Sequence, residues 1–135
     1  MITLLDYGAG NVRSVMNAVK KLGARIKPVK GPEDILKAEK LIFPGVGNYE
    51  SMIQILHQKN YIDPLREYLE SDRPFLGICL GMQALFEGSQ EDVSGLESLG
   101  FFKGSVDRFD TDLAVPHIGW NGVNIKQDSP VLKGV

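Results

Sequence analysis

The chain has few residues with which to build covalent cross-links or a metal centre. It contains one cysteine, Cys79, and two histidines, His57 and His117, among its 135 residues. A single cysteine forms no intrachain disulfide, and three such residues this far apart do not have metal-ligand spacing. The sequence therefore predicts no metal site and no disulfide, and it favours a reducing compartment.

Long apolar runs and an excess of charge of one sign are also missing. No apolar stretch reaches the roughly 18 residues that span a bilayer, and no basic region followed by an apolar one opens the chain. The 15 Lys and Arg residues nearly balance the 17 Asp and Glu residues, which disfavours a polybasic nucleic-acid-binding arm. We expect neither membrane nor nucleic acid as a partner, and a location in the cytoplasm, or in a plastid if a transit peptide has been removed.

Apolar residues are present in the proportion that one hydrophobic core requires. Hydrophobic residues make up 43% of the sequence and charged residues 24%, both close to globular averages. A chain of this length fits one domain. No internal repeat, low-complexity run or linker divides it, so the sequence predicts one domain over residues 1–135.

Short apolar, β-branched runs alternate with segments of helical periodicity as far as Phe86. The predicted strands are residues 2–5, 25–29, 41–43 and 75–78. The predicted helices are residues 12–22 with Asn11 as N-cap, 32–37, 49–57, 64–70 and 80–86. This alternation predicts an α/β fold with an open, mostly parallel sheet flanked by helices.

The pattern changes beyond Gly88. Glycines separate Phe101 and Phe102 from residues 106–109, which predicts a hairpin-like pair of β segments. A further strand is predicted at residues 123–125, and a helix that opens at Asp128-Ser129-Pro130 continues to Val135.

The segment Gly77-Ile78-Cys79-Leu80-Gly81 places a nucleophile between two glycines, and between a predicted strand and a predicted helix. In a nucleophile elbow the chain reverses sharply, and side chains two positions from the nucleophile would collide with the turn. The thiol is then presented at the C-terminal edge of the sheet, where open α/β folds bind ligands. The alternative is that Cys79 is a small core residue, which is the commoner fate of a lone cysteine. The flanking glycines favour the nucleophile.

The segment Pro44-Gly45-Val46-Gly47 follows another predicted strand and should emerge at the same edge. A thiolate that attacks an acyl carbon creates an oxyanion, which backbone N–H groups stabilise. Two glycines let a backbone amide approach or reorient. The amide of Leu80, next to the nucleophile, is a second candidate donor. Taken alone, such a segment is more often a plain turn.

The segment Gly8-Ala9-Gly10-Asn11 follows a strand and opens a helix, as a dinucleotide-binding loop does. Arg13 replaces the third glycine of that fingerprint. The second predicted strand runs into Val29-Lys30-Gly31 without an acidic residue for a ribose. A nucleotide site is therefore disfavoured, and no cofactor is expected.

Four segments together resemble a known family. They are Asp6-Tyr7-Gly8-Ala9-Gly10-Asn11, Pro44-Gly45-Val46-Gly47, Gly77-Ile78-Cys79-Leu80-Gly81-Met82-Gln83 and Pro116-His117-Ile118-Gly119-Trp120-Asn121. The combination is similar to the glutaminase part of imidazole glycerol phosphate synthase, a class I glutamine amidotransferase of histidine biosynthesis with a flavodoxin-like fold. Many class I amidotransferases share the cysteine segment, whereas its combination with the second and fourth segments is specific to this family. The resemblance covers nearly the whole chain.

The resemblance implies a role for each matching residue. Cys79 would be the nucleophile that forms a γ-glutamyl thioester and releases ammonia. The amides of Val46 and Leu80 would form the oxyanion hole, and the Val46 peptide would reorient to switch activity on. Gly45, Gly47 and Gln83 would hold the glutamine. The alternative for Gln83 is an ordinary polar helix residue.

The resemblance also implies a partner. His117, Trp120 and Asn121 would lie at the interface with a (βα)8-barrel cyclase, a separate subunit or a fused domain, to which the ammonia passes. Trp120 would lie near the gate of the ammonia passage, with a core or interface aromatic as the alternative. Two other functions stay open: a glutaminase of a different pathway, and a non-catalytic flavodoxin-like binding module in which Cys79 is structural or redox-sensing.

The sequence departs from this family at the triad. A cysteine nucleophile needs a histidine base and a carboxylate to orient it, and in the family both lie in a His-x-Glu motif near the C-terminus of the glutaminase. No segment of the chain matches that motif. We therefore expect an N-terminal portion of the domain, with a sheet that is incomplete at its C-terminus. His57 is expected to be a surface or hydrogen-bonded residue.

The 135-residue chain alone should not release ammonia from glutamine at a useful rate, because its thiol lacks a base. A coupled assay of ammonia and glutamate, with Cys79→Ala as the blank, measures this. Robust ammonia release that disappears in a His117→Ala variant would contradict the expectation.

Overall fold

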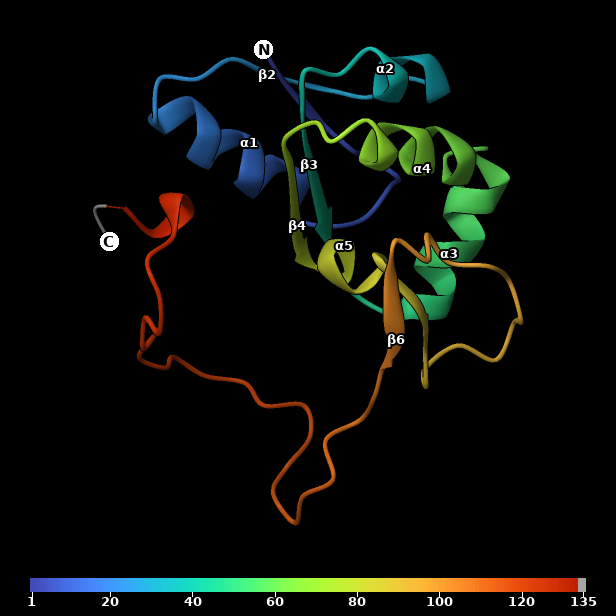
Figure 1. The fold of residues 1–135 in the computed structure, drawn as a ribbon, viewed down its shortest axis with the longest axis vertical. Coiled ribbons are helices and arrows are strands. Elements are labelled where there is room, and N and C mark those ends of the chain that lie inside the picture. Colours follow the sequence, from blue (N-terminus) through green and yellow to red (C-terminus); the bar gives the residue numbers. More distant parts are fainter. Residues whose placement is uncertain (134–135) are drawn as a thin grey trace.

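The computed structural model of the chain describes residues 1–133. Gly134 and Val135, which the sequence places in the last predicted helix, lie outside the described residues. Four parallel strands form the central sheet in the order β2-β1-β3-β4 (Figure 1). They are β1 Ile2–Leu4, β2 Ile26–Pro28, β3 Lys40–Gly45 and β4 Phe75–Cys79. The predicted open, parallel α/β sheet is confirmed, and its strand order is that of flavodoxin-like folds.

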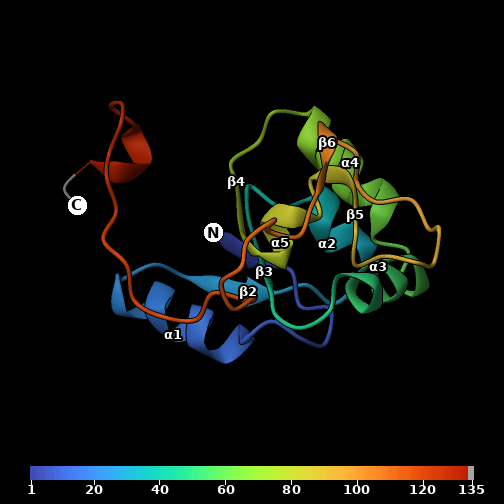
Figure 2. The ribbon, with the colours of Figure 1, turned by 90° about the horizontal axis from the view of Figure 1, so that it is seen from below.

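The helices cover the two faces of this sheet unequally. They are α1 Val12–Lys21, α2 Pro32–Leu36, α3 Tyr49–Gln58 and α4 Ile62–Glu70. Figure 2 shows α1 on one side of the sheet and the other three helices on the opposite side. No helix in the described part of the chain is long and apolar enough to cross a membrane.

Local sequence signals explain where these helices begin and end. Asn11 occupies the N-cap position of α1 with φ 53°, although its side chain makes no capping hydrogen bond. Gly23, with φ +79°, ends the same helix, and its N–H donates to the Lys20 carbonyl oxygen at 2.9 Å. At α3, the Asn48 side chain accepts from the Ser51 N–H at 3.0 Å.

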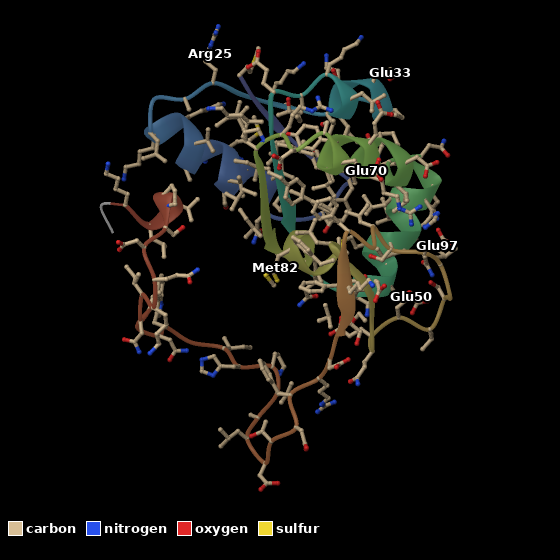
Figure 3. The ribbon with its side chains drawn as sticks, viewed as in Figure 1. Arg25, Glu33, Glu50, Glu70, Met82 and Glu97 are labelled. Atoms are coloured by element: carbon tan, nitrogen blue, oxygen red, sulfur yellow. The ribbon has the colours of Figure 1, made fainter. Side chains whose placement is uncertain are left out.

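The hydrophobic core lies mainly between the sheet and the three helices α2, α3 and α4. Its strand residues alternate along β3, where Leu41 and Phe43 are fully buried. The largest helical residues of the core are fully buried as well: Tyr49, Met52, Ile53, Leu56, Leu65 and Tyr68. Charged side chains such as Glu33 and Glu70 are directed outward (Figure 3). This packing makes β3 the best-anchored strand of the sheet.

The strand β4 lies at the edge of the sheet. Among the described strands it pairs only with β3, in a register that joins Leu41 to Phe75 and Gly45 to Cys79. Leu76 is 52% exposed and Ile78 is also exposed. β4 therefore presents apolar side chains to solvent on one face and an unpaired backbone along its outer side.

The structure corrects the predictions for residues 80–106. The predicted helix over residues 80–86 is only α5, Leu80–Gln83, and Phe86 begins a strand instead. That strand, β5 Phe86–Ser89, pairs in parallel with β6 Phe102–Val106, so the predicted hairpin is wrong. The rings of Phe86 and Phe102 lie 6.0 Å apart. This cross-strand contact outweighs the local helical periodicity.

The chain after β6 is an extended arm. It leaves the body and ends in a short 3₁₀ helix, η1 Pro130–Leu132, which lies apart from the sheet in both views (Figures 1 and 2). The predicted strand at residues 123–125 is wrong, because these residues are exposed and no described strand lies beside them to pair with. The predicted helix from Asp128 is reduced to this one turn.

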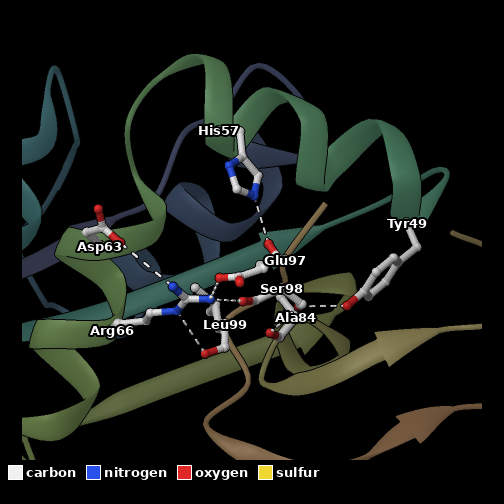
Figure 4. Close-up of polar contacts among 8 residues, drawn as sticks. All are labelled: Tyr49, His57, Asp63, Arg66, Ala84, Glu97, Ser98 and Leu99. Carbon is white, nitrogen blue, oxygen red and sulfur yellow. Dashed lines mark hydrogen bonds and ion pairs between the residues drawn. The ribbon is translucent and has the colours of Figure 1, made fainter. Parts of the chain in front are cut away.

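The connection between β5 and β6 is fastened to α4 by Arg66. The guanidinium donates to the carbonyl oxygens of Ser98 at 2.6 Å and Leu99 at 3.2 Å, and to the Glu97 carboxylate at 3.1 Å (Figure 4). A planar guanidinium supplies several donors at fixed angles, which suits three acceptors on adjacent residues. Arg66 therefore fixes the path of residues 97–99.

Helix α3 holds the same segment from its other side. The Tyr49 hydroxyl donates to Ser98 Oγ at 2.7 Å, and the Ser98 hydroxyl donates to the Ala84 carbonyl oxygen at 2.9 Å. The His57 ring donates from Nε2 to the Glu97 carbonyl oxygen at 2.7 Å. His57 is thus a hydrogen-bonded residue of the outer surface, as the sequence predicted.

Replacing Arg66 with alanine should lower the free energy of unfolding by about 1–3 kcal/mol, because the Ser98 and Leu99 carbonyl oxygens lose their donor. Arg25→Ala is the matched control, since Arg25 is exposed and points away from the body (Figure 3); its effect should stay below about 0.5 kcal/mol. Urea unfolding measures both variants. Equal midpoints for the two would show that Arg66 does not fasten this segment.

Candidate active site

Cys79 stands at the sharp turn between β4 and α5. It is the last residue of β4 and the N-cap of α5, with φ 54° and ψ −114°. A positive φ at a residue other than glycine costs backbone strain, which persists only where the surroundings enforce it. Cys79 is also exposed, which excludes the alternative of a core cysteine. The backbone therefore has the strand-to-helix turn that the Gly-x-Cys-x-Gly pattern predicted.

The glycines on both sides of Cys79 are required by close backbone contacts. A Cβ atom at Gly77 would lie 2.6 Å from the Gly81 carbonyl oxygen, and a Cβ atom at Gly81 would overlap the Phe43 carbonyl oxygen. Real Cβ atoms do not approach backbone atoms this closely. The turn thus packs directly on the backbone of β3.

The end of β3 lies beside the same turn. The strand predicted to end at residue 43 continues through Pro44 and Gly45, and Gly45 pairs with Cys79. A Cβ atom at Gly45 would overlap the Leu80 side chain and lie 2.9 Å from the Gly81 amide nitrogen. Gly45 therefore has a packing reason to be glycine, apart from any contact with a substrate.

The two predicted oxyanion donors lie at the ends of these segments. Leu80 is the first residue of α5, so its N–H has no acceptor within the helix. Val46 follows β3 directly and is 43% exposed. At Gly47, where φ is +102°, an added Cβ atom would meet nothing within 4 Å, so the Val46 segment is free of crowding on that side.

The loop after β1 packs behind the end of β3. A Cβ atom at Gly10, where φ is +109°, would lie 3.0 Å from the Pro44 carbonyl oxygen. The Asp6 side chain accepts from the Gly8 N–H at 3.0 Å and shapes this loop. Three segments that are distant in the sequence therefore meet at one edge of the sheet. The meeting of the Pro44 segment with the Cys79 turn was predicted, and the loop after β1 is an addition.

Tyr7 is the residue of this region that the sequence did not single out. Its ring meets the Phe43 ring edge-on at 5.8 Å, and the residue is 2% exposed. Burial raises the pKa of the Tyr7 hydroxyl, the Val46 backbone amide lowers it, and the charge of Cys79 raises it. Tyr7 belongs to the Asp6–Asn11 segment of the resemblance, but the sequence predicts no role for it, because its burial comes from packing against Phe43 of β3.

A cavity of about 570 Å³ contains Gln83 and His117 in its wall, together with residues from β5, β6 and the arm. Of the residues predicted to hold glutamine, Gly45 and Gly47 are not among those lining it. A second cavity, of about 670 Å³, lies beside Arg66 and residues 97–101 and is lined by no predicted site residue. Cys79, Val46 and Leu80 do not line the first cavity either, so Gln83 is its link to the predicted glutamine site.

The arm carries the remaining predicted residues. The Asn121 side-chain amide donates to His117 Nε2 at 2.7 Å, and both residues are exposed. Trp120 is fully exposed, so the alternative of a core aromatic is wrong. Within residues 1–133, no group of three or more His, Cys, Asp and Glu side chains is arranged to hold a metal ion.

Comparison with known proteins identifies the family. The family profile described as "Glutamine amidotransferase class-I" matches residues 3–134. The chain belongs to the class-I glutamine amidotransferase family. The resemblance that the four sequence segments indicated is thereby confirmed.

Several curated relatives are similar over most or all of the chain. It is 50% identical over its whole length to "Imidazole glycerol phosphate synthase hisHF, chloroplastic" of Arabidopsis thaliana, of which it covers 23%. It is 48% identical over 96% of its length to the hisHF protein of Schizosaccharomyces pombe, of which it covers 24%. It is 43% identical over its whole length to "Imidazole glycerol phosphate synthase subunit HisH" of Caldanaerobacter subterraneus, of which it covers 66%.

A solved structure shares the fold. The protein described as "Crystal structure of glutamine amidotransferase" superposes with a TM-score of 0.67 at 24% identity, over 79% of this chain and 56% of that one. The chain thus spans about a quarter of the hisHF relatives and about two thirds of the HisH subunit.

Replacing Gly81 with alanine should lower the free energy of unfolding by at least about 2 kcal/mol, because the new methyl group overlaps the Phe43 carbonyl oxygen. Gly88→Ala in β5 is the control: its methyl group meets no atom within 4 Å, and the change should stay below about 0.5 kcal/mol. Chemical denaturation compares the two. A Gly81→Ala protein as stable as the control would mean that the turn does not pack on β3 as described.

Proposed function

We propose that the chain carries the glutamine-hydrolysing site of an imidazole glycerol phosphate synthase, which supplies ammonia to a cyclase in histidine biosynthesis. The observation that carries this proposal is the exposed Cys79 at a strained strand-to-helix turn, paired in register with Gly45 of the Pro44-Gly45-Val46-Gly47 segment. The whole-length identity to relatives of that name supports the pathway. Residues 1–135 would all belong to one amidotransferase domain.

In the proposed reaction the Cys79 thiolate attacks the side-chain amide carbon of glutamine. The carbonyl oxygen becomes an oxyanion that accepts hydrogen bonds from the N–H groups of Val46 and Leu80. The C–N bond then breaks, the proton that the Cys79 thiol gave up is delivered to the leaving nitrogen, ammonia departs, and a γ-glutamyl thioester remains on the sulfur. Water hydrolyses the thioester to glutamate and restores the thiol.

Glutamine would be held beside Cys79 by Gln83 and by the backbone of Gly45 and Gly47. Gln83 ends α5 one turn after Cys79, and it is part of the wall of a cavity of about 570 Å³. Neither histidine is assigned as the base that accepts the thiol proton. His57 is bonded to the Glu97 carbonyl oxygen, and the His117 ring accepts from Asn121.

The partner would be a (βα)8-barrel cyclase that docks on the arm residues His117, Trp120 and Asn121. Trp120 and its neighbour Ile118 are almost wholly exposed, and aromatic residues of this kind are enriched at the centres of interfaces. One relative is named as a hisHF protein and another as a HisH subunit, so the cyclase would be fused or separate. The compartment, cytoplasm or plastid, stays a prediction.

The native gene product that contains this chain should be modified once by 6-diazo-5-oxonorleucine, a glutamine analogue with an electrophilic carbon at its side-chain end. Peptide mapping should place the adduct on Cys79, excess glutamine should protect it, and Cys79→Ala should remain unmodified. Cys79 is the one cysteine of residues 1–135, so a cysteine adduct that peptide mapping places within this chain is an adduct on Cys79.

Two results would redirect the proposal. A Cys79 that ignores the analogue, yet reacts with iodoacetamide, would favour the non-catalytic binding module. A protein that is modified, but whose glutamine hydrolysis is not stimulated by the histidine-pathway cyclase, would be a glutaminase of a different pathway.

A further inference from the structure

Ser98 is a polar residue in the hydrophobic interior. It is 3% exposed, and its hydroxyl both accepts and donates. The Tyr49 hydroxyl donates to Ser98 Oγ at 2.7 Å, and Ser98 donates to the Ala84 carbonyl oxygen at 2.9 Å (Figure 4). Burying a hydroxyl is costly unless it is bonded, and alanine would fill nearly the same space. These two bonds are therefore what a serine adds at this position.

The acceptor of the Ser98 hydroxyl ends the helix that the cysteine turn begins. Cys79 is the N-cap of α5 and Ala84 is its C-cap. The Ala84 N–H donates to the Leu80 carbonyl oxygen at 2.8 Å, and the Ala84 carbonyl oxygen also accepts from the Leu99 N–H at a longer 3.3 Å. A helix of one turn has no stability of its own. Its position must therefore come from contacts at its two ends.

The donor to Ser98 comes from the segment that faces the cysteine turn. Tyr49 is the first residue of α3, and it follows Val46 by three positions. Its side chain is fully buried, so packing fixes the place of its hydroxyl. The bonds from Tyr49 through Ser98 to Ala84 therefore connect the chain just after β3 with the far end of α5.

The near end of α5 is held in a different way. There Gly81 and Gly45 allow direct contact between the turn and β3, which fixes where the helix starts. A helix held at one end can still tilt. Since α5 is roughly 6 Å long, a displacement of about 1 Å at Ala84 would tilt it by about 10°. The Leu80 N–H points along the helix axis, so its direction would change with that tilt.

We propose that Ser98 is a positioning residue that holds α5 at the angle at which the Leu80 N–H faces the carbonyl oxygen of a substrate at Cys79. This inference rests on the proposed function, in which that N–H is an oxyanion donor and Gln83 holds glutamine. Ser98 acts through the Ala84 peptide and not on the substrate. Tyr49 orients it: because Tyr49 donates to Ser98 Oγ, the Ser98 proton is left for Ala84.

The test is Ser98→Ala in the native gene product, assayed with the cyclase in buffer without denaturant. The variant keeps the Cβ atom and removes only the hydroxyl. The kcat for glutamine should fall about fivefold to thirtyfold, which is less than the hundredfold that a misplacement of about 1 Å can cost. KM should rise, because Gln83 is the last residue of α5. Loss of folded protein would lower the apparent kcat and leave KM unchanged.

Tyr49→Phe is a second variant of the same chain of bonds. It leaves the bond from Ser98 to Ala84 and removes the donor that orients Ser98. The kcat should fall about twofold to fivefold, because one neutral hydrogen bond is lost. The double variant Tyr49→Phe/Ser98→Ala should have the kcat of Ser98→Ala alone, because Tyr49 acts through Ser98.

Tyr68→Phe is the matched control. Tyr68 is also fully buried, and its hydroxyl donates to the Pro74 carbonyl oxygen at 2.6 Å. Pro74 precedes the first residue of β4, whereas Cys79 is the last residue of that strand. Tyr68→Phe should lower the urea midpoint as Tyr49→Phe does, and it should leave kcat and KM unchanged.

A chemical readout reports on the oxyanion donors directly. A chloromethyl ketone analogue of glutamine reacts faster when its carbonyl oxygen is stabilised, whereas iodoacetamide needs no such stabilisation. Ser98→Ala should slow the ketone reaction at Cys79 and leave the iodoacetamide reaction unchanged.

The outcomes separate the two proposals. Wild-type kcat, KM and ketone labelling in Ser98→Ala, in a protein whose wild type hydrolyses glutamine, would overturn the role of Ser98 alone. An equal loss of kcat in Tyr68→Phe would do the same. If Ser98→Ala does not fold, Tyr49→Phe decides, and an unchanged kcat in that variant counts against Ser98. A wild type that neither hydrolyses glutamine with the cyclase nor is labelled by the ketone would overturn the proposed function, and the role of Ser98 with it.

Discussion

The contact between the cysteine turn and the backbone of β3 is the constraint on which the rest of the site depends. Gly81 lies against the Phe43 carbonyl oxygen, and Gly45 lies against Leu80, with no space for a methyl group at either glycine. Because backbone meets backbone here, the turn cannot shift without moving β3. The position of Cys79, the start of α5 and the exit of the chain at Val46 all follow from this one contact.

The asymmetric core explains how the contact is maintained. Leu41 and Phe43 of β3 belong to the same buried core as residues of α3 and α4, and a well-packed interior resists the adjustments that would relieve strain nearby. The positive φ of Cys79 is therefore held by packing that lies outside the candidate site. Tyr7 belongs to the same layer, and its hydroxyl is the one polar atom that this packing leaves unpaired among the described side chains.

Local sequence patterns were sufficient for the part of the fold in which each strand is followed by its own helix. The strands β1 to β4, the helices α1 to α4 and the turn at Cys79 were predicted from periodicity, capping residues and glycine spacing. The same reasoning failed at Phe86. This residue pairs with Phe102 of a strand that is distant in the sequence, and local periodicity does not detect such a pair. The burial of Tyr7 was not predicted for a related reason. It comes from packing against Phe43 of β3, which is distant from Tyr7 in the sequence. Local sequence patterns predict structure that depends on residues close together in the sequence. They predict a site built from distant segments only where a known motif marks it.

The edge strand β4 has a consequence for handling the protein in solution. Within residues 1–133, no strand pairs with its outer side, where Leu76 and Ile78 are exposed, and no lysine or proline interrupts residues 75–79. Such an edge is a template on which a second strand can add. Concentrated samples of the chain will therefore tend to associate edge to edge, which lowers the concentration at which the isolated chain stays monomeric.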